Sequence, residues 1–277
     1  MADAKATNTS SGADVQSAGP MRALFPYLAI AACAVVAYIF FYMVCGNPAN
    51  FADNDPIKGH PHGILGTIFK GGFIIPIGLT LLFTMFTFTV ERMFTILKAA
   101  GSGNLDVFVQ KVRMSLMKAD IDGAVKMCDT QSGSVGNVVK AGLRKYREME
   151  GNSHLDKEGK KEAIQAELEE ATMLELPSLE RNLSVLATIA SLGTLVGLIG
   201  TVMGMIRSFQ ALGAGGAPNA AELSVGISEA LVNTAIGITT SALAILCYNF
   251  FTTRIDAMTY RMEEVGYSIV QTFDQKH

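Results

Sequence analysis

The chain has no tryptophan and little charge: only 17% of its 277 residues are Asp, Glu, Lys or Arg, whereas about 25% is usual in soluble globular proteins. Its net charge is only −3, so it lacks the excess of Lys and Arg that a nucleic-acid-binding surface needs. Because 49% of the residues are hydrophobic, a highly charged disordered chain is excluded as well. A composition this apolar is typical of a protein that spans a membrane.

Motifs for metal binding, cofactor binding or catalysis are also missing. There is no Walker A sequence, no GxSxG, no HExxH and no dinucleotide fingerprint, so no cofactor and no enzyme activity is predicted. His60-Pro61-His62 could contribute two metal ligands, but no Cys or further His is nearby, and a polar turn is the preferred interpretation. The cysteines form no CxxC pair and are predicted to be small buried hydrophobic residues rather than a disulfide or zinc framework. They are Cys33, Cys45, Cys128 and Cys247.

Four runs with almost no charge are long enough to cross a bilayer, which takes about 20 residues as a helix. They predict an all-α, polytopic membrane protein with four transmembrane helices. The first run exceeds the 7–15 apolar residues of a cleaved signal peptide and no small-x-small site follows it, so an uncleaved anchor is favoured over a signal peptide. The runs are 23–45, 71–90, 182–206 and 223–251.

The basic residues predict how these helices are oriented. Of the 22 Lys and Arg residues, 14 lie between Glu91 and Arg181, and three more follow Phe251. Since cytoplasmic loops retain Lys and Arg, both termini and the central segment are predicted to be cytoplasmic. The remaining segments are then a disordered cytoplasmic tail (1–22), extracytoplasmic loops (46–70 and 207–222), a cytoplasmic segment (91–181) and a cytoplasmic tail (252–277).

The central segment 91–181 has helical patterns throughout. Asn104 can cap a helix whose apolar residues share one face, and further helices are expected near 122–128, at 135–150 and over 160–176. With 15 acidic and 14 basic residues, the segment is nearly neutral. We predict that it extends the membrane helices and is not an independent enzyme domain.

The third run carries two stripes of small residues. Hydroxyls recur at three- and four-residue steps, which places them on one helix face; they are Ser184, Thr188, Ser191, Thr194, Thr201 and Ser208. Beside them lies a glycine stripe with two GxxxG units, which lets helix backbones approach closely; it consists of Gly193, Gly197, Gly200 and Gly204. Helix packing accounts for the glycines, while the hydroxyls fit either packing or a polar path.

The fourth run contains a carboxylate, Glu229, on the same face as Asn233, with Thr234 at the edge of that face. An ionisable group inside a membrane helix costs at least about 2.5 kcal/mol, and such a group is a candidate functional residue. Because Glu229 lies near one end of the run, an interfacial carboxylate that reaches the lipid headgroups is the alternative.

The last two runs carry a resemblance to a known family. The sequences SLGTLVGLIGTVMGMIRSFQALG and GISEALVNTAIGITTSALAILCYNF closely resemble the signature of the ExbB/TolQ/MotA family of ion-driven inner-membrane motor subunits, and specifically its ExbB/TolQ branch. GGFIIPIGL before Glu91-Arg92 is similar to the family's first helix, and KADIDGAVKMCDTQSGSVGNVVKAGL is similar to its cytoplasmic segment. The resemblance covers roughly 71–251.

The resemblance implies a homopentamer in the inner membrane whose last two helices line a central pore. That pore would enclose the helices of an ExbD-like single-span partner with an intramembrane aspartate, and a TonB-like protein would receive the work. Thr201 and Thr234 match the family's pore-lining threonines, and Glu229 matches its intramembrane glutamate. Thr188 and Asn233 are further candidates for the ion path.

The implied function is therefore a proton-channel subunit that uses the proton motive force to energise TonB-dependent outer-membrane transport. A TolQ-like envelope-maintenance or gliding-type motor is the alternative, and a scaffold without an ion path is a more distant one. Hydroxyls could also bind Na⁺, so the ion stays open between H⁺ and Na⁺. The helix 23–45 is additional to the three spans common in this family, and we expect it on the outside of the pentamer, either as an anchor or as a docking site.

Overall fold

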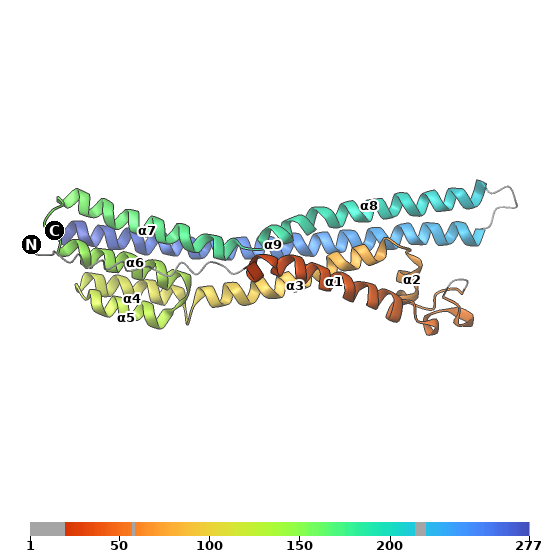
Figure 1. The fold of residues 1–277 in the computed structure, drawn as a ribbon, viewed down its shortest axis with the longest axis horizontal. Coiled ribbons are helices and arrows are strands. Elements are labelled where there is room, and N and C mark those ends of the chain that lie inside the picture. The colour runs from red at the N-terminus through yellow and green to blue at the C-terminus, as the bar shows by residue number, and fades with distance from the viewer. Residues whose placement is uncertain (1–19, 57–58, 214–219, 277) are drawn as a thin grey trace, which may run out of the picture.

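The computed structural model describes residues 20–56, 59–213 and 220–276. Across these ranges the chain is an elongated bundle of helices without a β-strand (Figure 1). Within the described ranges, four helices are long and apolar enough to cross a membrane, which confirms the predicted all-α class with four candidate spans. They lie within the stretches Leu24–Cys45, Ile75–Met117, Leu183–Gln210 and Leu223–Lys276.

Helices α8 (Leu183–Gly213) and α9 (Ala220–Lys276) lie side by side along the membrane half of the bundle, and α3 (Ile75–Ala100) packs against them (Figure 1). Helix α2 (Ile64–Lys70) lies at one end of this half, which we call the loop end. The other end of the molecule, where α4 to α7 gather around α9, is called the domain end.

Helix α9 has 57 residues and continues through the segment that was predicted to be a cytoplasmic tail. The physical reason is the spacing of its apolar residues, which recur every three or four positions and are therefore on one face. That face is buried against the helices of the domain end. Its residues are Ile255, Met258, Met262, Val265, Ile269 and Phe273.

The central segment forms four helices, as its patterns predicted. They are α4 (Leu105–Met117), α5 (Ile121–Gln131), α6 (Gly133–Glu150) and α7 (Lys157–Glu180). The cap predicted for α4 is confirmed, because the Asn104 side chain accepts a hydrogen bond from the backbone N–H of Asp106 at 2.8 Å. The rings of Tyr146 and Phe273 meet edge to face at 5.1 Å in the core between α6 and α9. The domain end is thus built around the last third of α9.

The N-terminal helix α1 (Pro20–Ile39), which continues as a π-helical turn over Phe40–Cys45, packs against α3. Ala37 is fully buried in this contact, and the rings of Phe40 and Phe83 meet edge to face at 5.7 Å. Much of the remaining α1 surface is apolar and exposed. Its outer face is therefore suited to lipid.

A joint connects α7 to α8. Arg92 of α3 is 1% exposed, and its guanidinium donates to the Leu179 carbonyl at 3.2 Å. The same guanidinium pairs with Glu91 at 2.6 Å. Asn182, in the two-residue break between the helices, has a left-handed φ of 62°. The buried arginine thus supplies a donor to the carbonyl end of α7, where helix carbonyls lack partners of their own.

Burial in the domain end raises the pKa of the Cys128 thiol to about 12. At pH 8 roughly one such thiol in ten thousand is ionised, and only the thiolate is nucleophilic. We therefore expect Cys128 to resist a water-soluble maleimide at pH 8 in the folded chain and to react after denaturation, as read by peptide mass spectrometry. An introduced thiol at the exposed position of Ser153 (Ser153→Cys) is the matched control and should react at once. Rapid modification of Cys128 in the folded chain would contradict the buried core.

Candidate functional site

A buried ion pair lies at the loop end, between α8 and α9. The Glu229 side chain is 3% exposed, and Nη1 of Arg207 lies 2.6 Å from one of its carboxylate oxygens. The same nitrogen lies 2.7 Å from the other oxygen. Arg207 itself is 43% exposed, so the pair has one buried and one accessible partner. A carboxylate in such surroundings requires a counter-charge or a proton.

The turn before α3 closes over this pair. Gly72 has a left-handed φ of 77°, and a Cβ atom at this position would lie 2.8 Å from Cδ of Glu229 and 2.9 Å from Nη1 of Arg207. The ring of Phe73 lies 5.5 Å from the Arg207 guanidinium, which is a cation–π distance. Only glycine has both the conformation and the size that this contact requires.

Asn233 joins the same cluster from one helical turn further along α9. It is 4% exposed, and its Nδ2 donates to the Gly71 carbonyl at 2.8 Å and to the Glu229 carbonyl at 3.0 Å. Glu229 and Asn233 therefore both face the turn before α3. The predicted common face of α9, which carries Glu229 and Asn233, therefore contacts both α8 and the turn before α3 within one chain.

The glycine stripe of α8 faces α9. A Cβ atom at Gly204 would lie 2.7 Å from the Gly226 carbonyl oxygen, and one at Gly193 would lie 3.0 Å from the Gly237 carbonyl oxygen. A Cβ atom at Gly197 would meet the Gly237 Cα at 3.4 Å, and Gly200 lies against the Asn233 side chain. The two helix backbones are thus close enough for main chain to contact main chain.

The hydroxyls of α8 and α9 fall into two groups. In the helix contact, Thr194 Oγ1 lies 3.0 Å from Ser241 Oγ, and Thr234 donates to the Ala230 carbonyl at 3.0 Å and approaches the Gly197 carbonyl at 3.4 Å. The other two bond within α8: Thr201 donates to the Leu198 carbonyl at 2.6 Å and Thr188 to the Ser184 carbonyl at 2.7 Å. Thr188 is exposed and Thr201 is half-buried.

The predicted site residues therefore do not form one cluster in the single chain. Glu229 and Asn233 are buried inside it, Thr234 lies between its helices, and Thr188 and Thr201 lie toward its surface. Among the described residues, no hydrogen bond joins Thr201 to Glu229. A path that includes all of them would need the surface of α8 to be covered by other helices.

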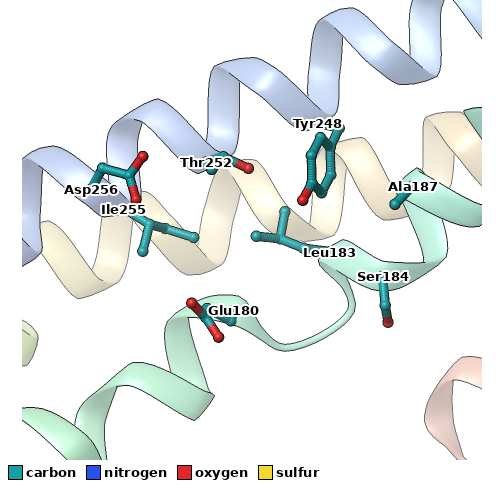
Figure 2. Close-up of a pocket in the computed structure, with 8 residues that line it drawn as sticks. All are labelled: Glu180, Leu183, Ser184, Ala187, Tyr248, Thr252, Ile255 and Asp256. Carbon is teal, nitrogen blue, oxygen red and sulfur yellow. The ribbon is translucent and has the colours of Figure 1, made fainter.

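A cavity of about 390 Å³ lies at the joint between α7 and α8 (Figure 2). Ser184, the first hydroxyl of the α8 row, is at its edge, and two carboxylates from α7 and α9 flank it. Its lining residues are Glu180, Leu183, Ser184, Ala187, Tyr248, Thr252, Ile255 and Asp256. Within the described ranges no group of three or more His, Cys, Asp or Glu could hold a metal ion. The cavity has a mixed polar and apolar lining and lies where the hydroxyl row meets the domain end.

Arg207 directly follows the third run, 182–206, and was not predicted as the partner of Glu229. The signal was present, because α8 and α9 are consecutive antiparallel helices. A basic residue near the end of one helix and an acidic residue near the start of the next lie at the same end of the two helices. Arg207, directly after run 182–206, and Glu229, within run 223–251, satisfy this.

These features define a multi-pass helical membrane protein with a buried charge pair and hydroxyl-bearing helices. A family model described as the MotA/TolQ/ExbB proton channel family matches residues 131–264, which include α8 and the membrane half of α9. The chain also aligns with the biopolymer transport protein ExbB of Salmonella typhimurium at 30% identity over 175 residues, covering 61% of this chain and 72% of that protein. The chain belongs to the MotA/TolQ/ExbB family.

TolQ proteins match at similar identity. The Tol-Pal system protein TolQ of Pseudomonas aeruginosa is 32% identical over 133 residues, which is 48% of this chain and 57% of that protein. TolQ of Haemophilus influenzae is 38% identical over 84 residues, which is 30% of this chain and 37% of that protein. The chain therefore spans about half or less of the length of these TolQ relatives. Identity alone does not separate the ExbB and TolQ branches.

The Gly72→Ala substitution tests the closed turn. We expect it to lower the free energy of unfolding by about 2–4 kcal/mol. Alanine is strained in the left-handed conformation, and its Cβ atom would in addition clash with Glu229 and Arg207. Gly103→Ala is the matched control: Gly103 also has a positive φ, of 90°, but no atom lies within 4 Å of its Cβ position. Its cost should be only about 1–2 kcal/mol. Denaturant unfolding in detergent measures both, and equal losses would contradict the packing of the turn against the pair.

Proposed function

We propose that this protein is the ion-channel and stator subunit of an ExbB-ExbD-type complex that uses the proton motive force to energise TonB-dependent outer-membrane transport. The chain would assemble as a pentamer in the inner membrane, with both termini and the domain end in the cytoplasm. The loop end would then face the periplasm. No catalytic role is proposed for any residue.

The observation that carries the proposal is that α8 carries hydroxyls at membrane depth outside its contact with α9. Thr188 is exposed and Thr201 half-buried in the single chain, and lipid would offer a hydroxyl there no partner beyond its own helix. A central pore between subunits gives these groups a wet surface. The cavity at the α7–α8 joint would be the inner opening of this path, since Ser184 and the carboxylates of Glu180 and Asp256 are among its lining residues (Figure 2).

The mechanism assigns the moving proton to the aspartate of a single-span partner. Thr201 and Thr234 would supply hydroxyls that hydrogen-bond this carboxyl group or water around it. Each charge that crosses the membrane yields roughly 2.3 kcal/mol per 100 mV, so the complex would work in repeated small steps. The 57 residues of α9 run without a break from the pore into the domain end, and a rotation of its membrane half would therefore be transmitted there.

The Thr201→Val substitution tests the ion path. It removes a hydroxyl and keeps the volume, so we expect membrane insertion and assembly to persist while gradient-driven uptake falls at least about tenfold, within the range for loss of a functional polar contact. Uptake of a TonB-dependent nutrient by cells that depend on this protein measures the effect. Thr80→Val is the matched control, because the Thr80 hydroxyl also donates to its own helix, to the Pro76 carbonyl at 2.7 Å, but lies on α3. Full uptake with Thr201→Val would refute the assignment.

A TolQ-like role in envelope maintenance is the second candidate, favoured by the similar identity to TolQ relatives. Complementation separates the two. Expressed with its own partner subunit in a strain that lacks both ExbB and TolQ, the chain should restore growth on a siderophore as iron source if the transport role is correct. Restored detergent resistance without siderophore growth would favour the TolQ-like role.

A further inference from the structure

Two opposing effects act on the protonation of the Glu229 carboxyl group. Burial of a carboxylate favours the protonated form, whereas a contacting cation favours the ionised form. The two effects oppose each other here. Both oxygens of Glu229 lie within 2.7 Å of one guanidinium nitrogen, a length typical of charge-assisted hydrogen bonds.

Arg207 is the charged group that acts on this carboxylate. Among the described residues, the interactions of the Glu229 carboxylate with another charged side chain are those with Arg207. Lys70, two residues before Gly72, directs its Nζ over the Phe51 ring at 5.7 Å. The Gly72 backbone also lies against the carboxylate, and the neutral Asn233 side chain donates to the backbone carbonyl of Glu229.

The position of the pair is also fixed from three sides. Phe73 stacks against the guanidinium, Gly72 closes over the carboxylate, and Asn233 ties the backbone of Glu229 to the turn before α3. Arg207, Gly72 and Asn233 therefore hold Glu229 at the turn before α3. Among the described residues, no hydrogen bond joins Glu229 to Thr201 of the proposed path.

We infer that Arg207 is a positioning residue that keeps Glu229 ionised and bound to the turn before α3, so that Glu229 does not exchange protons in this arrangement. The inference rests on the proposed ion path and deepens it, because it assigns Glu229 a fixed negative charge and leaves proton carriage to another group. Arg207 forms the outer part of the pair and is the partner that water can reach.

Reaction with dicyclohexylcarbodiimide tests this inference. The reagent takes the proton of a carboxylic acid onto its nitrogen as the carboxylate adds to its carbon, and the adduct rearranges to a stable N-acylurea, so only a protonated carboxyl reacts. The purified full-length chain in detergent at pH 7 is treated, and the peptide containing residue 229 is analysed by mass spectrometry. We expect little adduct in the wild type. Arg207→Gln should increase it at least about tenfold, since a contacting charge shifts protonation by that factor or more.

Three variants complete the experiment. Arg207→Lys restores a cation and should return the adduct close to the wild-type level. Arg254→Gln is the matched control, because Arg254 also stacks on a phenylalanine, Phe250 at 5.4 Å, but lies far along α9; it should leave labelling unchanged. Glu229→Gln should abolish the adduct. Protection of Cys128 from maleimide reports that each variant is folded.

Equal labelling of the wild type and Arg207→Gln, whether strong or absent in both, would overturn the inference. Labelling in Arg207→Lys as strong as in Arg207→Gln would overturn it as well, since a merely structural side chain would then explain the effect. The result is independent of uptake: labelling reports the charge of Glu229 in the chain alone, whereas uptake reports the work of the whole complex. Either proposal can therefore fail without the other.

Discussion

The absence of water in the hydrocarbon of a bilayer is the constraint on which the rest of this structure depends. Each polar group there needs a partner from the protein, and each charge needs a counter-charge. Among the described residues, two ion pairs with one buried partner each satisfy this requirement at opposite ends of the membrane helices: Arg207 with Glu229 near the loop end, and Arg92 with Glu91 at the α7–α8 joint. Each pair also contacts the main chain or a turn of another helix. The charges therefore fix the positions of α3, α8 and α9 relative to one another.

Small residues let these helices approach closely enough for the pairs to form. Gly204 and Gly226 bring the backbones of α8 and α9 together near the loop end, and Arg207 and Glu229 each follow one of these glycines by three residues. Without a hydrophobic driving force between helices in lipid, close backbone contact and interhelical hydrogen bonds supply much of the association. At the domain end the balance changes, because Tyr146, Phe273 and their neighbours bury apolar surface from water. The same helix, α9, is thus held by two different forces along its length.

The spans, the glycine stripe and the Asn104 cap could be predicted because each is a local pattern of composition or spacing. The continuation of α9 was hidden because Asp256 and Arg261 interrupt its hydropathy, although Met258 and Met262 keep the helical period. The separation of Glu229 from Thr201 could not be predicted, since both lie on helix faces whose rotation depends on tertiary contacts. A helical wheel places residues on one helix relative to each other. It does not say which neighbouring helix a given face meets.

The division of polar groups between the inside and the outside of the chain has a consequence for how the family's mechanism applies here. A fixed ion pair contributes a constant local electric field and a rigid contact between helices. A proton carrier, in contrast, must gain and lose its charge in each cycle. The closure of Gly72, Phe73 and Asn233 around Arg207 and Glu229 favours the first role, because each contact would have to be broken to let the carboxylate turn toward the α8 surface. Among the described residues, the hydrogen bond of the Thr201 hydroxyl is to the Leu198 carbonyl of its own helix. Under the proposed function, the partner's carboxyl group would carry the moving charge past such hydroxyls, while Glu229 would keep a fixed charge inside the chain.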